Sequence, residues 1–164
     1  MIRLLDRITT AAGAAGALCF AALLMVMLFE VASRYALGRP TIWSTETAAL
    51  LNTTGFLLAA GLALRQGAHV GIDVLAARLP PRLRDAILSL FLLAVFLPLL
   101  AWLFDAAAAR AWSAWQAGEV DDVSPWRRPI WTKHAALALG VACFAVSVLA
   151  EGLRAAARMM QRHG

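Results

Sequence analysis

The sequence predicts an all-α integral membrane protein with four transmembrane helices, a short interfacial segment between the second and the third, and both termini in the cytoplasm. Three observations lead to this fold class. The chain is 62% hydrophobic and only 15% charged, a composition that does not suit a water-exposed surface. Its charged residues are grouped so that four long uncharged windows remain, and most of its basic residues fall on one side of those windows.

The uncharged windows define the spans. They cover residues 8–29, 47–64, 86–104 and 135–150. A helix that crosses about 30 Å of hydrocarbon needs about 20 mostly apolar residues, so the first three windows suffice, and polar residues extend the fourth. Continuous apolar runs favour helices over the alternating strands of a membrane barrel. We predict one membrane domain, residues 1–164, with spans at about 10–32, 44–64, 86–110 and 133–153.

The basic residues predict the orientation. Nine Lys and Arg residues fall on the side of the predicted spans that holds the N-terminus, against six on the other side. The positive-inside rule therefore places both termini and the interfacial segment, residues 65–84, in the cytoplasm, and the loop 116–132 in the periplasm. The net charge of +5 then indicates affinity for anionic membrane lipid, with no nucleic-acid partner.

The first span carries two patterns. Arg3 and Arg7 precede its apolar run, as in a secretory signal, but the run exceeds the about 7–15 apolar residues of such a signal. We therefore predict a retained span, with a cleaved signal as the alternative. Gly13, Ala17 and Ala21 recur at four-residue spacing, with Gly16 beside them, and predict a face on which another helix packs closely.

Two residues of opposite charge end the first span. Glu30 and Arg34 are four residues apart and predict a supporting ion pair on one helical face. An ion-coupling carboxylate at the membrane edge is the alternative role for Glu30. Gly38 and Pro40 then break the helix and predict a short outward loop.

The second span begins with a polar turn. Trp43 marks the membrane interface, and Ser44 or Thr45 is expected to cap the helix. Glu46 falls in the first turn, where the helix dipole favours a carboxylate. This local position is sufficient to explain Glu46.

Three polar residues, Asn52, Thr53 and Thr54, lie deep inside the second span. Amides and hydroxyls at that depth usually bond a neighbouring helix or their own backbone, and we expect the same here. A transport pathway lined by these residues is the alternative.

A polar interruption follows the second span. Arg65, His69 and Asp73 recur at four-residue intervals, so a helix that continued through them would align them on one face. Gly67 and Gly71 weaken such a helix, and the apolar residues between them suit a segment lying along the cytoplasmic surface. The position of His69 at a helix end favours anchoring over catalysis or proton relay.

The third span contains Pro98 at mid-depth, which predicts a kink where a backbone hydrogen bond is lost. Past Asp105 we expect the helix to continue as far as Trp115. The loop 116–132 is acidic and contains two prolines, and either a periplasmic partner contacts it or it is a plain solvated loop.

The chemistry of an enzyme is missing from this sequence. His69, His134 and His163 fall at predicted helix ends or in the tail, which does not suit paired haem ligands. Cys19 and Cys143 lie inside predicted spans and indicate buried thiols, not a disulfide or metal framework. No carboxylate lies near mid-membrane, as a proton-coupled exporter would need, and no phosphate loop is present. We predict a subunit with no catalytic residue, no metal and no cofactor.

Two blocks of sequence resemble the small membrane subunit of tripartite ATP-independent periplasmic (TRAP) transporters, of the DctQ type. The first block runs from Glu30 to Pro40 and on to Trp43 and Glu46, and resembles the Arg-Tyr, Pro, Trp and Glu signature of that family. The second block, 64–73, resembles the Arg, Gly, His and Asp motif after its second helix. Length, number of spans and cytoplasmic termini agree over the whole chain.

The resemblance implies sodium-driven uptake of an organic acid, such as a dicarboxylate, in the bacterial inner membrane. It also implies two partners. A periplasmic solute-binding protein delivers the substrate, and a large permease subunit holds the sodium and substrate sites and moves in elevator fashion. The small subunit enlarges the static scaffold and offers part of the docking surface. An independent four-helix channel or exporter is the alternative.

The motif residues are predicted to fix helix ends and the subunit interface and to bind no substrate. They are Glu30, Arg34, Tyr35, Pro40, Trp43, Glu46, Arg65, Gly67, His69 and Asp73.

Overall fold

A computed structural model describes residues 2–66, 80–122 and 126–161, and most of these residues are helical. The elements in chain order are α1 (Ile2–Ala36), α2 (Ser44–Arg65), α4 (Pro81–Leu90), the π-helical segment η1 (Phe91–Phe96), α5 (Leu97–Gln116) and α6 (Trp131–Gln161). Because α4, η1 and α5 are continuous, they form one long helical span.

The predicted all-α fold with four transmembrane helices is confirmed. Among the described residues, four helical stretches are long and apolar enough to cross a membrane, with mean hydropathies from 1.6 to 2.7. They are Leu5–Ala36, Ser44–Arg65, Leu83–Gln116 and Trp131–Met160. The first stretch exceeds the expected 10–32, and the helix of the third ends at Gln116, one residue beyond the predicted Trp115.

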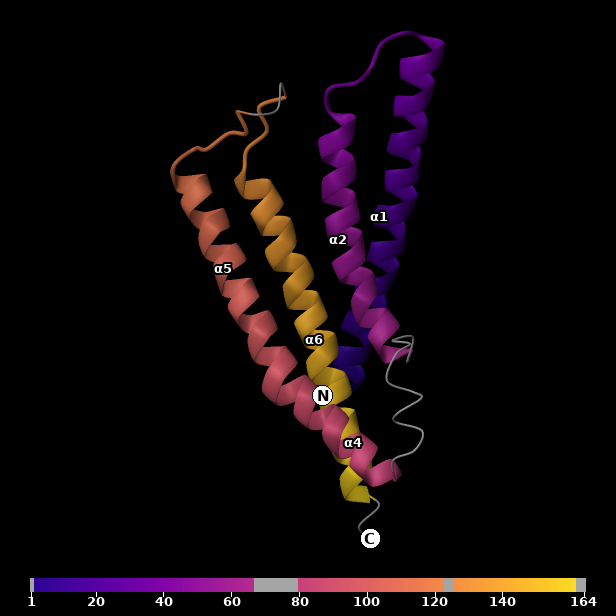
Figure 1. Cartoon of the computed structure of the whole chain (residues 1–164), viewed down its shortest axis with the longest axis vertical. Helices are drawn as coiled ribbons and strands as arrows, with labels where there is room; N and C mark the ends of the chain where they lie inside the picture. Colours follow the sequence, from indigo (N-terminus) through magenta and orange to yellow (C-terminus); the bar gives the residue numbers. More distant parts are fainter. Residues whose placement is uncertain (1, 67–79, 123–125, 162–164) are drawn as a thin grey trace.

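The helices stand in a row in the order α1, α2, α6 and α5 (Figure 1). They spread apart at the end that carries the α1–α2 and α5–α6 connections, here called the loop end. They converge at the opposite end, here called the terminal end, where α1 begins and α6 finishes (Figure 1). α6 packs against α1, α2, α4, η1 and α5, so it is the central helix of the molecule.

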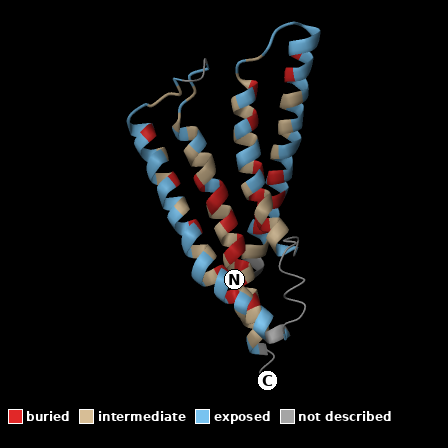
Figure 2. Ribbon diagram, in the orientation of Figure 1, coloured by how far each residue is buried: buried red, intermediate tan, exposed pale blue. Residues whose placement is uncertain are grey.

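The buried core lies along α6. Val141, Phe144 and Val148 of α6 pack against Leu92 of η1 and Leu100 of α5. In the most apolar window of α6, 44% of residues are buried, against 17% in each of the other three spans. Figure 2 shows these buried positions concentrated on α6, while α1 and α5 expose most of their surface.

The packing face of α1 includes the predicted Gly13 and Gly16 but not Ala17 and Ala21. Gly13 lies against Leu62, and a Cβ added to Gly16 would stand 2.9 Å from the Gly55 oxygen and the Ala59 nitrogen. Ala17 and Ala21, which were expected on this face, are exposed. The contact follows a row of three-residue spacing instead of the predicted four, as happens when two helices cross through their i±3 ridges.

The disturbance predicted at Pro98 takes the form of a change in helical register. Pro98 falls in the first turn of α5, directly after the π-helical segment Phe91–Phe96. Proline lacks the N–H that an α-helical bond needs, and its ring clashes with the carbonyl of the preceding turn. A wider π turn before the proline accommodates both effects without ending the helix.

Candidate functional site: the α1–α2 corner and the terminal end

A network of hydrogen bonds around Glu30 closes the corner between α1 and α2. Glu30 is only 6% exposed, and Arg34 donates to its Oε1 from Nε at 3.0 Å and from Nη2 at 2.5 Å. The backbone N–H of Thr41 donates to Oε2 at 2.9 Å, and the Thr41 hydroxyl contacts the same oxygen. The predicted ion pair between Glu30 and Arg34 is confirmed, and the loop adds two further donors.

Ser33 fixes the start of the connecting loop. Its carbonyl accepts from the N–H groups of Leu37 and Arg39 at 3.3 and 3.0 Å, and its hydroxyl donates to the Arg39 oxygen at 2.5 Å. Gly38 has φ +65°, a conformation that glycine adopts without steric cost. Gly38 is recognisable from the sequence as a helix breaker, whereas the roles of Ser33 in the last turn of α1 and of Thr41 in the loop are not, because small polar residues carry no distinctive signal.

The cap predicted for α2 is wrong. Trp43 occupies the N-cap position and makes no side-chain cap bond, while the Ser44 hydroxyl donates backwards to the Thr41 oxygen at 3.2 Å. Ser44 is therefore used to hold the loop. The Trp43 ring stacks on Phe29 of α1 with ring centroids 5.9 Å apart.

The remaining residues of the first motif differ in exposure. Tyr35 is 81% exposed, and Pro40 is exposed in the connecting loop. Glu46 lies in the first turn of α2, as predicted. Both of its carboxylate oxygens are shielded from solvent and have no hydrogen-bond partner among the described residues. Glu46 thus differs from Glu30, whose oxygens are both bonded.

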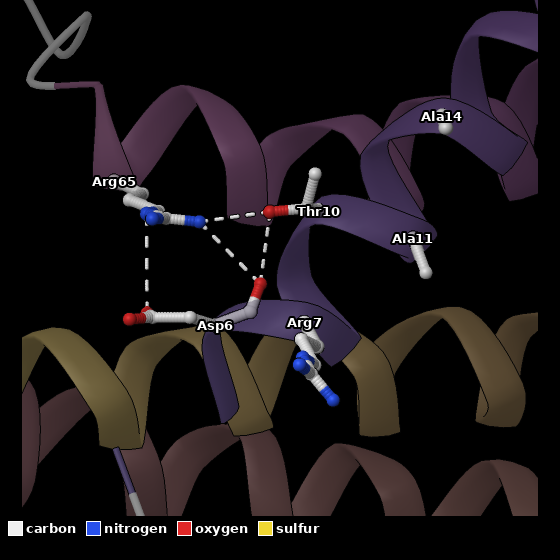
Figure 3. Close-up of a pocket in the computed structure, with 6 residues that line it drawn as sticks. All are labelled: Asp6, Arg7, Thr10, Ala11, Ala14 and Arg65. Atoms are coloured by element: carbon white, nitrogen blue, oxygen red, sulfur yellow. Dashed lines mark hydrogen bonds and ion pairs between the residues drawn. The ribbon is translucent and has the colours of Figure 1, made fainter. Parts of the chain in front are cut away.

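Arg65 joins the last turn of α2 to the first turns of α1. Its Nη1 donates to the Thr10 hydroxyl at 2.8 Å and lies 3.4 Å from the Asp6 carbonyl. Its Nε is 3.9 Å from the Asp6 carboxylate. These groups and Arg7 line an open hollow of about 500 Å³ on the surface of α1 (Figure 3). The predicted role of Arg65 in fixing this helix end stays a prediction.

A chain of ion pairs extends from this point across the terminal end. Asp6 also pairs with Arg154 of α6, whose Nη1 lies 2.8 Å from Glu151. Glu151 accepts from Arg158 at 3.1 Å, and Arg158 lies 3.5 Å from Asp85 of α4. Four helices are thereby linked. From the sequence these charges indicated only the orientation, although the spacing of 151, 154 and 158 places them on one face of a helix.

A buried pair of hydroxyls lies beside the ion pairs. The hydroxyls of Thr9 and Ser147 are 3.0 Å apart and join α1 to α6. Thr9 also lies 3.0 Å from the Leu5 carbonyl oxygen and Ser147 3.1 Å from the Cys143 carbonyl oxygen, so one hydroxyl donates to the other and the second donates to the carbonyl of its own helix. Each hydroxyl is thus satisfied inside the protein, as polar groups within a membrane must be. A Cβ on Gly61 of α2 would collide with Ser147, so three helices meet here.

The two motif blocks lie at opposite ends of α2. The residues around Glu30 and Trp43 gather at the loop end, whereas Arg65 lies at the terminal end (Figure 1). Gly67, His69 and Asp73 fall outside the described residues. Their predicted alignment with Arg65 on one face stays a prediction.

The connection between α5 and α6 is held at its base. Arg110 of α5 donates to Glu119 at 2.5 Å, and this hydrogen bond from the guanidinium holds the pKa of Glu119 below its ordinary value. Backbone bonds run from the N–H of Asp121 to the Arg128 oxygen at 2.9 Å and from the N–H of Ile130 to the Glu119 oxygen at 3.0 Å. The described part of this loop is folded back on itself.

These sites offer ion pairs and hydrogen bonds but little reactive chemistry. Within residues 2–66, 80–122 and 126–161, no group of three His, Cys, Asp or Glu side chains is placed to hold a metal ion. The two cysteines, Cys19 and Cys143, are free and only partly buried. The geometry of the described residues suits the joining of helices to each other.

Comparison with known proteins gives the family. The sequence profile of the tripartite ATP-independent periplasmic transporters, DctQ component, matches residues 23–158. The chain is also 35% identical over 71 residues to the sialic acid TRAP transporter small permease protein SiaQ of Vibrio cholerae. That match covers 43% of this chain and 41% of the relative. The chain therefore belongs to the DctQ component family of TRAP transporters, and it is a multi-pass membrane transporter subunit rather than an enzyme.

Proposed function

We propose that this chain is the small permease subunit of a sodium-coupled uptake system in the bacterial inner membrane, where it scaffolds a large permease subunit. The family match over residues 23–158 carries the proposal. The ion pairs of the spans support it, because Glu30, Asp6 and Glu151 each pair with arginines of the same chain near a helix end. Carboxylates engaged in this way are suited to fastening helices and not to cycling a coupling ion.

The proposed orientation places the terminal end in the cytoplasm and the loop end in the periplasm. The excess of basic residues on the side of the termini supports this orientation. It would present the α1–α2 corner and the folded α5–α6 loop to a periplasmic solute-binding protein. Both are held by internal bonds and would offer that protein a preformed docking surface.

The substrate is proposed to be an organic acid. The relative from Vibrio cholerae is described as a sialic acid transporter subunit, and sialic acid carries a carboxylate. Sialic acid is accordingly the first substrate to test. Dicarboxylates come second, because the description of the Vibrio cholerae relative does not name them. Substrate choice would rest with the large subunit and the binding protein.

The test is reconstitution with defined components. The chain is co-expressed with the large permease subunit from its own genome, purified, and placed in liposomes with the binding protein and a sodium gradient. We expect uptake only when all three proteins are present. Uptake or ion leak with this chain alone would overturn the scaffold role and favour the independent channel or exporter.

A further inference from the structure

The outward face of α2 differs chemically from the outward faces of its neighbours. α1 exposes large apolar side chains such as Leu18, Leu24 and Met25, each at least 60% exposed. α5 likewise exposes Leu99 and Trp102. These faces suit contact with lipid tails.

α2 exposes almost no large apolar side chains, although it is no more buried than α1 or the α4–α5 span. The exposed positions in its outer half are Thr45, Ala49, Asn52, Thr53 and Phe56, of which only Phe56 is a large apolar side chain. Thr45, Ala49, Asn52 and Phe56 follow the alternating four- and three-residue spacing of a seam between two packed helices. Small residues on such a seam let the two backbones approach closely.

Asn52 cannot remain uncovered at its depth. It lies eight residues from Ser44, the first residue of α2, which at 1.5 Å per residue is about 12 Å along the helix. That position is inside a hydrocarbon layer about 30 Å thick. The side chain is exposed, and lipid tails offer no donor or acceptor to an amide. The expected bond from this amide to a neighbouring helix of the same chain is absent among the described residues.

Glu46 adds an unpaired charge at the same end of α2. Its carboxylate oxygens are shielded from solvent and have no partner among the described residues. The residue as a whole is half-buried, so its carboxylate would have to turn outward to meet a cation of a partner, which is the group that would complete this site. An anionic phospholipid head group would be repelled by it, whereas a lysine or arginine of a neighbouring polypeptide would not.

We propose that the face of α2 formed by Thr45, Ala49, Asn52 and Thr53 is the seat of a transmembrane helix of the large permease subunit. That helix would bond Asn52 through a polar side chain and present a basic residue toward which the Glu46 carboxylate turns. This inference rests on the proposed function. A second copy of the chain fits less well, because two-fold packing through this face in one membrane orientation would bring one Glu46 to the same level as the other.

The first test is photo-crosslinking in the co-expressed complex. A photoreactive phenylalanine derivative replaces Ala49 in one variant and the exposed Leu24 of α1 in the control. We expect a covalent adduct with the large subunit from position 49 and none from position 24. An adduct between two copies of this chain from position 49 would show that a second copy, and not the large subunit, lies on this face of α2. That result would overturn the proposal.

The second test uses Ala49→Phe, Asn52→Leu and Glu46→Gln, with Leu24→Phe as the matched control. We expect each of the first three changes to lower the amount of large subunit recovered per small subunit by at least about threefold. Leu24→Phe should leave it unchanged. Asn52→Leu should not lower the thermal stability of the isolated small subunit, because it replaces an uncovered amide with an apolar group.

The outcomes separate the two proposals. If the unsubstituted chain fails to bring down its large subunit, the proposed function fails. If the unsubstituted chain binds and the three variants bind as well as Leu24→Phe, the scaffold role stands and the assignment of this face is wrong. A loss of binding accompanied by a loss of helical circular dichroism in the isolated variant would also count against the assignment, since these positions would then belong to the fold of the chain itself.

Discussion

Glu30 and Gly16 show how single side chains, or the lack of one, fix the pairing of α1 with α2. Glu30 accepts bonds from Arg34 of its own helix and from Thr41 of the loop, so it sets where the chain turns. Gly16 lets the two backbones come together, because a Cβ there would stand 2.9 Å from atoms of α2. One residue acts through a charge and the other through the space it leaves.

The change Gly16→Leu should destabilise the subunit by about 1–3 kcal/mol, since an overpacked helix contact forces backbone shifts. Ala17→Leu is the control, because Ala17 is exposed on the same helix. Thermal unfolding of the two variants in the same detergent measures the difference. Equal midpoints would show that α1 and α2 do not meet through Gly16.

The change Glu30→Gln distinguishes support from ion coupling. We expect it to lower the thermal midpoint of the small subunit, because glutamine keeps the shape of the side chain but loses the charge that binds Arg34 and Thr41. Transport should fall only in proportion to the complex that assembles. Full assembly with loss of sodium-dependent uptake would instead give Glu30 a coupling role.

At the scale of elements, ion pairs fasten the α5–α6 connection to both helices, Arg110 of α5 with Glu119 and Lys133 of α6 with Asp121. The bond from Arg110 keeps the pKa of Glu119 low, so the carboxylate stays charged below the pH at which a free glutamate becomes protonated. A depressed pKa stabilises the folded loop above the ordinary glutamate pKa. That contribution is lost as pH falls through the lowered pKa.

Acidification should therefore loosen this loop below the ordinary glutamate pKa. An acid-tolerant protease such as pepsin should cut the loop of the unsubstituted subunit faster as the pH falls through this range. Glu119→Gln removes the titrating group, and its cleavage should change less over the same interval. A parallel pH dependence in both proteins would assign the loosening to other carboxylates.

At the scale of the whole molecule, the helices form an open row that is fastened at the terminal end. Asp6 contacts both Arg65 and Arg154, and α6 lies against all the other described helices. The loop end, where the helices spread, has no comparable set of ion pairs across all four spans among the described residues. Such a row has two broad faces and suits a scaffold laid against a larger protein.

The change Arg154→Gln should loosen the terminal end while leaving the loop end intact. Hydrogen exchange of the first two turns of α1 and the last two of α6 should accelerate, because Asp6 and Glu151 lose a shared partner. Arg7→Gln is the control, since Arg7 is exposed and lies one residue from Asp6. Faster exchange at the α1–α2 corner in Arg154→Gln would show that the two ends are not independent.

The sequence predicted the spans well because hydropathy depends on composition alone, and it predicted the Glu30–Arg34 pair because both residues lie on one helix. It could not predict contacts between residues far apart in the chain. Asp6 with Arg154 and Thr9 with Ser147 depend on which helix faces which. For the same reason the sequence did not show that Gly13 and Gly16, and not Ala17 and Ala21, contact α2. The Ser44 cap failed because the loop offered that hydroxyl a different acceptor.

The contact between α1 and α6, the first and last helices, determines the order in which the helices can assemble during synthesis. Asp6 is synthesised near the start of translation and Arg154 near its end, so at 5–20 residues per second they are separated by roughly 7–30 s. Arg65 is synthesised much earlier than Arg154 and can pair with the Asp6 carboxylate during that interval. The ribosome therefore delivers a hairpin of α1 and α2 first, and the arrival of α6 completes the assembly.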